Sequence, residues 1–318
     1  MIRNIEQMPE LTAESFFAQC LPEPVEKPNS QIMTKITTNP SATSPADIKL
    51  LVLDIDGTIA GMSNQISPKV QQAIEAVRVK GVQVAIATGR MYQSALRFHK
   101  QIGSSLPLVA YQGALIKDPL SQAIHQHQPL NQKIALQLLD YFDRPEVRSA
   151  ISVHCYIDDR LYIRELTPES QAYVERVGVT PRVHADLRPF VSSTAPTKML
   201  ALSEDLLAIE HLMEAIASHY SPTELYLTKS NSTFFEAANP GANKGVGVRY
   251  LAEEFLGLTA ANVMVLGDNF NDIEMLEYAG IGIAMGNAPA PVKALAHWVA
   301  PDVESDGAAT AIEKFLLP

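Results

Sequence analysis

Two aspartates separated by one residue follow a short apolar run near the start of the chain. Residues 48–53 are mostly apolar and lead directly into the sequence DIDGT. An apolar run of this length that stops at polar residues is typical of a buried parallel strand. Residues i and i+2 of an extended chain point the same way, so Asp54 and Asp56 can converge on one ligand where the strand ends. Gly57 allows the backbone to turn sharply there.

Three further polar clusters follow predicted strands or loops. Thr88 ends a predicted strand at residues 82–87. Lys244 lies in the loop NPGANKG, and Asp268 and Asp272 follow a later strand. The carboxyl ends of strands in an open parallel sheet share one crevice. We therefore expect all four clusters to surround one site.

This set of side chains suits phosphoryl transfer. A phosphate dianion repels a carboxylate nucleophile, so a hard cation such as Mg²⁺ must lie between them, held by oxygen ligands. Asp54, Asp268 and a backbone carbonyl can supply those ligands, and attack by Asp54 would form an aspartyl phosphate. Asp56 can act as general acid and then as general base. Thr88 and Lys244 can bind the phosphate oxygens.

Each of these residues also has a plainer explanation. Asp54 and Asp56 stand in a turn, where Asp is common. Thr88 is expected to cap the following helix in any case, and Lys244 alone could be a solvated surface lysine. The occurrence of all four clusters in order favours the functional interpretation.

The length, charge and cysteine count of the chain argue against several classes of protein. The 318 residues, 47% of them hydrophobic, are enough for about two domains with a full core. A formal charge of -10 argues against a nucleic-acid or anionic-membrane surface. The two cysteines, Cys20 and Cys155, form no disulfide framework and no metal-type spacing. With no long apolar run and no signal-peptide pattern, a cytoplasmic location is the simplest expectation.

The order of predicted elements indicates an α/β fold in two parts. Strands alternate with helices at residues 47–128 and again at 236–318, which predicts a Rossmann-like, doubly wound parallel sheet as the catalytic core. Residues 129–235 carry antiparallel signals, including a hairpin at Asp158, and predict an inserted α+β cap domain. Residues 1–46 are rich in Glu, Pro, Ser and Thr, which predicts a flexible extension.

The motifs DIDGT, ATGR, NPGANKG and GDNFND resemble the four motifs of the haloacid dehalogenase superfamily. Their order, and the insertion between the second and third, resemble its Cof-type phosphatases, whose mobile cap lies at that point. The resemblance covers residues 47–317. It implies a Mg²⁺-dependent phosphatase that acts on small phosphorylated metabolites, such as sugar phosphates or phosphorylated cofactors, through an aspartyl phosphate.

The resemblance also implies roles in catalysis and metal binding. Asp54 resembles the nucleophile and a metal ligand, and Asp56 the general acid and base whose backbone carbonyl also binds the metal. Asp268 resembles the remaining metal ligand. Lys244 resembles the catalytic lysine that binds phosphate, and Asp272 an acid beside the metal and the lysine.

The resemblance implies that Thr88, Gly89 and Asn271 contact the phosphate, and it places Arg90 near the substrate entrance. Arg90 is otherwise an ordinary residue at a helix start. The chain departs from the family where Gln112 stands in a Tyr-Gln-Gly sequence, because many relatives show Asn-Gly there. That departure concerns substrate contacts more than phosphoryl chemistry.

Several other side chains have two explanations. His125 and His127 could bind a metal from one strand face, or lie on an exposed hairpin. Asn287 could contact the crevice or form a turn, and Trp298 is predicted to be in the core. Candidates for substrate contact in the cap, which surface exposure explains equally well, are His154, Tyr156, Arg160, Arg164 and Lys198.

Two alternatives to a phosphatase remain open. A phosphomutase of the same superfamily would return the phosphoryl group to a second hydroxyl. A non-catalytic phospho-ligand sensor would use the aspartate as a switch, but Asp56 and the long insertion argue against it, because a switch needs neither a general acid nor a lid. In each case the expected partner is a small phosphorylated metabolite, without nucleic acid or membrane, and the protein is expected to be a monomer or homodimer.

Overall fold

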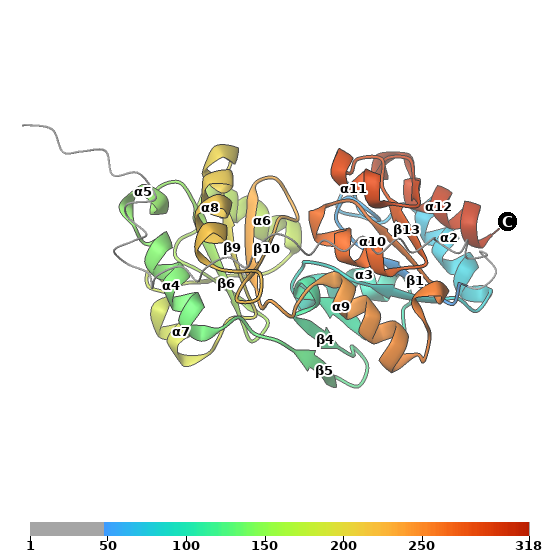
Figure 1. Ribbon diagram of the computed structural model, residues 1–318, viewed down its shortest axis with the longest axis horizontal. Helices are drawn as coiled ribbons and strands as arrows, with labels where there is room; N and C mark the ends of the chain where they lie inside the picture. The colour runs from blue at the N-terminus through green and yellow to red at the C-terminus, as the bar shows by residue number, and fades with distance from the viewer. Residues whose placement is uncertain (1–47, 318) are drawn as a thin grey trace, which may run out of the picture.

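The computed structural model describes residues 48–317 as two lobes, which lie side by side in Figure 1. The core lobe holds the elements from β1 to β5 and from α9 to the last helix, and the cap lobe holds the elements from α4 to β11. The flexible extension predicted for residues 1–46, including Cys20, lies outside the described residues. No helix within the described range has the length and apolar character needed to cross a membrane.

A five-stranded parallel sheet forms the centre of the core lobe, in the order β14-β13-β12-β1-β2. Leu53 at the end of β1 lies opposite Leu266 on one side and Ile86 on the other. On one side β1 pairs with β2, the next strand in the chain, and on the other side it pairs with β12, which comes after the cap. The strand order reverses at this point, so polar residues after β1 and β12 lie at a topological switch point. The strands are β1 (Leu50–Leu53), β2 (Gln83–Ile86), β12 (Val263–Gly267), β13 (Ile281–Ala284) and β14 (Trp298–Val299).

Helices cover both faces of this sheet, which confirms the predicted doubly wound fold. Leu51 and Leu53 pack in a cluster with the helices of one face, and Leu50 and Val52 pack in a cluster with those of the other. All four side chains are fully buried, as a continuous apolar strand predicts. The first face carries α2 (Pro68–Val79), α3 (Tyr92–Gln101) and α12 (Gly307–Leu316), and the second carries α9 (Lys244–Arg249), α10 (Ile273–Tyr278) and α11 (Ala290–Leu295).

A three-stranded antiparallel sheet extends the core lobe towards the cap. It joins the main sheet through a parallel bridge between Ala87 and Val109. Between its first two strands, Tyr111 and Gln112 both have left-handed backbone conformations, with φ of 52° and 60°. The strands are β3 (Leu108–Ala110), β4 (Leu115–Lys117) and β5 (Ile124–His127).

The cap lobe contains a mixed six-stranded sheet in the order β10-β11-β9-β6-β7-β8. The hairpin predicted at Asp158 joins β6 to β7, and Asp158 and Asp159 both have positive φ, as a tight two-residue hairpin requires. The strands are β6 (Ser152–Ile157), β7 (Arg160–Ile163), β8 (Arg182–Val183), β9 (Lys198–Leu202), β10 (Tyr226–Thr228) and β11 (Phe234–Ala238).

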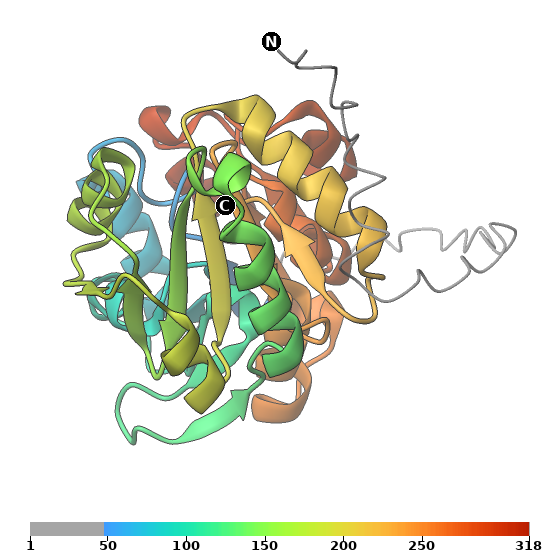
Figure 2. The same ribbon diagram turned by 90° about the vertical axis from the view of Figure 1, so that its left-hand side faces the viewer.

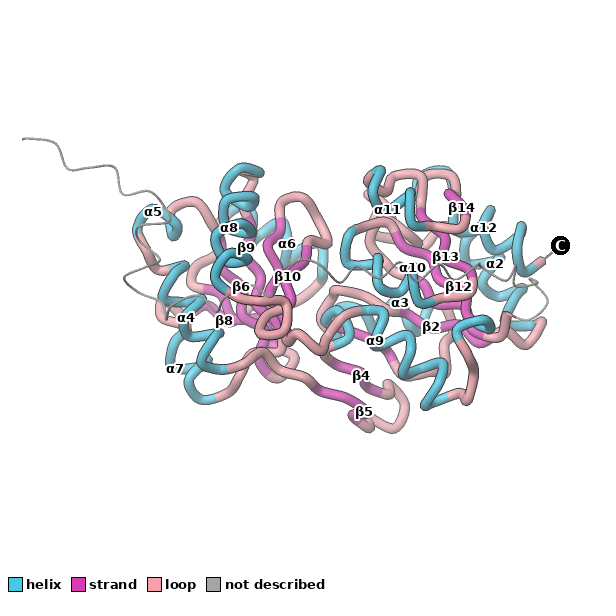
Figure 3. The backbone as a smooth tube through the Cα atoms, viewed as in Figure 1, coloured by secondary structure: helices cyan, strands magenta, loops and turns pink. Residues whose placement is uncertain are grey.

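Most cap helices pack on the face of the cap sheet that lies away from the core. Figure 2, which looks at the cap, shows α4 and α8 in front of its strands, and Figure 3 shows strands inside each lobe with helices around them. Val174 of α6 instead belongs to the apolar cluster that continues into the core lobe. The cap helices are α4 (Gln132–Phe142), α5 (Pro145–Arg148), α6 (Pro168–Val177), α7 (Arg188–Ser193) and α8 (Leu206–His219).

The helix after the glycine-rich loop changes type along its length. After α9 the chain continues as a π-helix at Tyr250–Phe255. In this wider helix Leu251 and Ala252 are fully buried. The Tyr250 hydroxyl lies 3.0 Å from Nδ1 of His125 on β5.

Truncation of Phe142 tests the packing of the cap lobe. Its side chain is fully buried, and its ring packs edge-to-face on Phe235 with the centroids 5.8 Å apart. Because Phe142→Ala removes this contact and leaves a cavity, we expect it to lower the free energy of unfolding by about 3–5 kcal/mol. Urea denaturation followed by circular dichroism measures the change. The control Leu207→Ala removes a side chain that is 62% exposed, and an equal loss in both variants would contradict the prediction.

Candidate active site

A cavity of about 400 Å³ lies between the lobes at the carboxyl edge of the core sheet. Residues after β1, β2 and β12 line it on the core side, and α6, β9 and β11 line it on the cap side. The core residues include Asp54, Asp56, Thr88, Gly89, Arg90 and Asn271, and the cap residues include Tyr173, Arg176, Lys198, Leu200 and Phe234.

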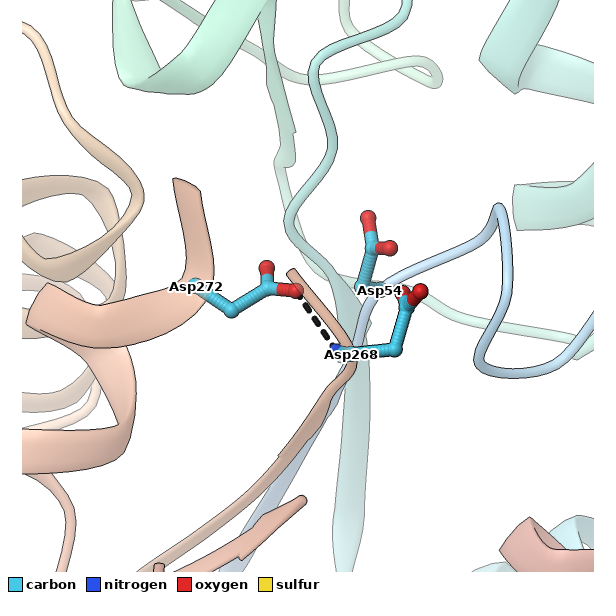
Figure 4. Close-up of side chains that lie close together, drawn as sticks. All are labelled: Asp54, Asp268 and Asp272. Carbon is cyan, nitrogen blue, oxygen red and sulfur yellow. Dashed lines mark hydrogen bonds between the residues drawn. The ribbon is translucent and has the colours of Figure 1, made fainter. Parts of the chain in front are cut away.

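Three buried carboxylates form a cluster beside this cavity (Figure 4). Asp54 follows β1, Asp268 follows β12 and Asp272 lies in the short helix after Asp268; oxygens of all three lie within 4.8 Å of one another. One oxygen of Asp272 accepts hydrogen bonds from the backbone N–H groups of Asp268, at 2.7 Å, and of Asn269, at 2.9 Å. Asp272 therefore holds the loop that carries Asp268.

Lys244 joins two of these carboxylates from the N-terminus of α9. Its side chain is fully buried, and its Nζ donates to Oδ1 of Asp54 at 2.7 Å and to Oδ1 of Asp272 at 2.5 Å. Burial lowers the pKa of Lys244, but the charges of Asp272 and Asp54 outweigh burial, so its pKa is raised overall. The alternative explanation of Lys244 as a solvated surface lysine is therefore wrong.

The cluster contains three acidic side chains and one basic side chain. Burial raises the pKa of Asp54 to about 7 despite the opposing charge of Lys244, and burial with the charges of Asp54 and Asp272 raises the pKa of Asp268 well above its usual value. Three carboxylates facing one lysine leave an excess that a divalent cation would neutralise, and carboxylate oxygens are ligands for a hard cation. Asp54 and Asp268 each line a cavity, whereas Asp272 has no exposed surface and its oxygens accept from Lys244 and from backbone N–H groups, so Asp54 and Asp268 fit the role of ligands best.

The DIDGT loop packs tightly against Asp268. Gly57 has φ of +81°, and a Cβ atom there would lie 2.1 Å from Oδ2 of Asp268, so only glycine fits this position. Thr58 donates to Oδ1 of Asp268 at 3.1 Å, and the Asn287 side chain donates to Oδ2 at 3.2 Å. Both explanations for Asn287 hold in part, because it lies in the turn after β13 and also contacts the acidic cluster through Asp268.

Two arginines bind the carboxylate of Asp56. Arg90 donates from Nε to Oδ2 and from Nη2 to Oδ1, both at 2.6 Å. Arg176 of α6 donates to Oδ1 at 3.0 Å. Burial raises the pKa of Asp56, but its hydrogen bonds and charge interactions with Arg90, and then with Arg176, outweigh burial and lower the pKa.

These two arginines differ in how well the sequence indicated them. Arg90 is buried and precedes α3, so the ordinary helix-start explanation is wrong. Sequence reasoning missed Arg176, because an arginine in the last turn of a helix is common on protein surfaces. No local signal could have placed it beside Asp56.

Thr88 lies at the end of β2, as predicted, but it does not cap a helix. Its backbone N–H donates to the carbonyl of Val109 at 2.9 Å, and its hydroxyl accepts from the backbone N–H of Arg90 at 3.2 Å. Helix α3 begins later, with Met91 as its N-cap residue. The Thr88 hydroxyl still has a proton to donate towards the cavity that it lines.

Of the five cap candidates, Lys198 lines the cavity. Its Nζ donates to the carbonyl of Gly89 at 2.8 Å and to Oε2 of Glu236 at 2.6 Å. His154 and Tyr156 are instead buried in the cap and contact Tyr173, with the two tyrosine hydroxyls 2.6 Å apart.

The other two cap candidates have different positions. Arg164 is buried and pairs with Asp143 at 2.8 Å, and Arg160 is exposed at the start of β7. Surface exposure therefore explains Arg160 alone among the five. The aromatic residues of the cavity wall, Tyr173 and Phe234, had no pattern in the sequence that marked them.

His125 and His127 have separate partners. His125 contacts Tyr250, and Nε2 of His127 lies 3.0 Å from the Thr197 hydroxyl. Within residues 48–317, the three aspartates are the single group of His, Cys, Asp and Glu side chains with metal-binding spacing. Trp298 is half-buried at the edge of the core, where it packs edge-to-face on Phe315.

Comparison with known proteins agrees with the fold. The family model of the haloacid dehalogenase-like hydrolases matches residues 51–312. The 5-amino-6-(5-phospho-D-ribitylamino)uracil phosphatase YitU of Bacillus subtilis is 27% identical over 84% of this chain and 97% of its own length. The pyridoxal phosphate phosphatase YbhA of Escherichia coli is also 27% identical, over 85% of this chain and 99% of its own length.

A solved structure shows the same fold. The crystal structure of TM0651 from Thermotoga maritima superposes with a TM-score of 0.69 and 27% identity, covering 84% of this chain and 97% of that one. The family match spans both lobes and all four motifs. The chain therefore belongs to the haloacid dehalogenase-like hydrolases, among their Cof-type phosphatases.

Proposed function

We propose that this phosphatase is Mg²⁺-dependent and hydrolyses small phosphorylated metabolites through an aspartyl phosphate on Asp54. The observation that carries the proposal is the buried cluster of Asp54, Asp268, Asp272 and Lys244, which lies at the edge of the cavity between the lobes. Such a cluster is costly to bury unless it binds a further charge.

In this proposal Asp54, Asp268 and the backbone carbonyl of Asp56 hold the cation. When bound, Mg²⁺ supplies positive charge that offsets the repulsion between the phosphate and Asp54. The hydrogen bond from Lys244 orients Asp54 towards the phosphorus atom. Asp272 holds both Lys244 and the loop of Asp268 in place.

The remaining core residues bind the phosphate and move the proton. The Thr88 hydroxyl, the backbone of Gly89 and Lys244 are proposed to bind phosphate oxygens. Asp56 would give a proton to the leaving oxygen and later take one from the water that attacks the aspartyl phosphate. Arg90 and Arg176 give Oδ1 of Asp56 two donors and Oδ2 one, so Oδ2 keeps a lone pair that can take the proton.

The cap side of the cavity supports sugar phosphates or phosphorylated cofactors as substrates. Tyr173, Leu200 and Phe234 provide an apolar wall, whereas Arg176 and Lys198 provide polar contacts. A cavity of about 400 Å³ suits a small metabolite. YitU is named for 5-amino-6-(5-phospho-D-ribitylamino)uracil and YbhA for pyridoxal phosphate, which supports small phosphorylated metabolites as the substrate class here.

We also propose that residues 129–235 act as a lid on a core formed by residues 47–128 and 236–318. Polar contacts cross between the lobes, from Lys198 to Gly89 and from Tyr111 to Asp159. Strand β11 spans the proposed boundary at residue 236. A lid of this kind would exclude bulk water during turnover, in a cytoplasmic protein that acts as a monomer or homodimer.

Replacement of the proposed nucleophile tests the mechanism. Asp54→Asn keeps the shape of the side chain but removes its negative charge, so we expect kcat to fall at least about 10³-fold. Release of inorganic phosphate from a panel of sugar phosphates and phosphorylated cofactors, with and without Mg²⁺, measures the loss. The control Asp140→Asn changes a cap aspartate whose side chain is 60% exposed. Activity retained in Asp54→Asn, or a transferred phosphate as main product, would contradict the proposal.

The raised pKa values predict that metal binding depends on pH. Mg²⁺ competes with protons for Asp54, whose pKa is about 7 without metal. One competing proton lowers the apparent affinity roughly tenfold between about pH 8 and about pH 6. Calorimetric titration with MgCl₂ measures this change, and equal affinities at both pH values would exclude it.

The free energy of unfolding of the metal-free protein should fall as pH rises, whereas its affinity for Mg²⁺ should rise. Because the pKa of Asp54 is raised from 3.8 to about 7 on folding, the folded state binds more protons than the unfolded state between these values. The contribution of Asp54 to stability is complete below the lower value and is lost as pH rises through the upper one. Thermal unfolding in EDTA across this range checks the sign.

A further inference from the structure

The last turn of α6 in the cap lobe docks on two polar side chains of the core lobe. Asn64 donates from Nδ2 to the carbonyl oxygen of Arg176 at 2.5 Å, and Ser94 donates from Oγ to the carbonyl oxygen of Val177 at 2.8 Å. Both carbonyls belong to the last turn of α6, where carbonyl groups have no partner within the helix. The core lobe therefore supplies the donors that this end of a cap helix requires.

The same two side chains hold the guanidinium of Arg90. Nη2 of Arg90 donates to Oδ1 of Asn64 at 2.7 Å, and Nη1 donates to Oγ of Ser94 at 3.4 Å. Ser94 and Arg90 are buried, and Asn64 is half-buried. Arg90 in turn binds both oxygens of Asp56. Asn64 and Ser94 thus lie between the cap helix and an arginine that orients Asp56.

The chemistry of the outer groups fixes the direction of these hydrogen bonds. A guanidinium only donates, and a backbone carbonyl only accepts. Asn64 must therefore turn its oxygen to Arg90 and its NH₂ group to α6, while Ser94 points its proton at α6 and a lone pair at Arg90. With α6 docked, its carbonyls hold both acceptor oxygens towards Arg90. With α6 displaced, both side chains lose the partner that sets their orientation.

Helix α6 also brings its own arginine to the same carboxylate. Nη2 of Arg176 donates to Oδ1 of Asp56 at 3.0 Å and to the carbonyl oxygen of Gly61 at 3.3 Å. The backbone of Arg176 is held by Asn64 while its side chain reaches Asp56. Docking of α6 therefore acts on Asp56 by two routes, directly through Arg176 and indirectly through Arg90.

We infer that Asn64 and Ser94 are positioning residues that couple docking of the cap lobe to the orientation of Asp56. We call Asn64, Ser94 and the last turn of α6 the docking contact. Asp56 then has the geometry for proton transfer only while the cap lobe is docked, so the general acid does not act when the cavity is open to bulk water. The inference rests on the proposed function, in which Asp56 gives and takes the proton.

Hydrogen exchange tests the docking contact without any need for turnover. Asn64→Gly removes the amide but keeps the backbone, because Asn64 has left-handed φ of 55°, which glycine adopts freely. Loss of a hydrogen bond raises the population in which α6 is open, so we expect its amides to exchange about three- to tenfold faster. Mass spectrometry of peptides from α6 measures the change, and peptides from α8 should not change. Unchanged exchange in α6 would overturn the docking contact.

Two aryl phosphates test whether the docking contact acts through Asp56. The p-nitrophenolate ion leaves readily without a proton, whereas phenolate leaves poorly and depends more on a general acid. We expect Asn64→Gly to lower kcat/KM about tenfold for phenyl phosphate but within about twofold for p-nitrophenyl phosphate. Equal losses for both substrates would mean that Asn64 only shapes the cavity, and would overturn the inference. The matched control Gln122→Gly changes an exposed residue that also has left-handed φ, of 62°.

The same assay on Asp56→Asn separates the inference from the proposed function. This variant should show the same preference for p-nitrophenyl phosphate, because it lacks the general acid itself. Equal losses in Asp56→Asn, or a wild type that releases no phosphate, would refute the proposed function. A selective loss in Asp56→Asn but not in Asn64→Gly would overturn the inference alone.

Ser94→Ala repeats the test from the other side chain of the docking contact. It removes the hydroxyl that joins Arg90 to α6, so we expect the same selective loss for phenyl phosphate, of about three- to tenfold. Equal losses for the two substrates would again overturn the inference. The matched control is Ser218→Ala, because the exposed Ser218 also donates to a helix carbonyl, that of Ala215 at 2.8 Å, but within α8. Circular dichroism verifies that each variant is folded.

Discussion

The burial of Lys244 among carboxylates is the interaction on which the rest of the site depends. A lysine with no exposure to solvent is tolerated only when its charge is paired, because an unpaired buried charge costs several kcal/mol, of order ~3–5. Its partners come from the end of β1 and from the turn after β12. The pairing therefore ties the start of α9 to two neighbouring strands, and the parallel sheet holds those strands in register.

The same cluster explains why the loops around it are so constrained. Gly57 must lack a side chain so that the DIDGT loop can approach Asp268. Asp272 uses its second oxygen to hold the backbone of the loop that carries Asp268. Each constraint keeps a carboxylate oriented towards the cavity. The core side of the cavity is therefore built from strand ends and short turns. Parallel sheets bind their ligands at such strand ends.

The cap lobe takes part in the chemistry of the site through individual side chains. Arg176 contacts Asp56, and Lys198 contacts the backbone of Gly89 and the carboxylate of Glu236. Gln112 donates to Glu236 and accepts from Asn271, so buried hydrogen bonds connect the cap sheet to the loop after β12.

The sequence by itself determined the sheet, its two helical faces and the positions of the acidic and basic residues of the core. These are local signals: Asp54, Thr88 and Asp268 each follow an apolar strand, and the strand order brings such ends together. Only the tertiary structure decided the contacts of Arg176, the direction of the amide bonds at Gln112, and the separate partners of His125 and His127. Those features depend on residues distant in the chain, whose side chains acquire partners only when the lobes pack, and no local periodicity encodes that packing.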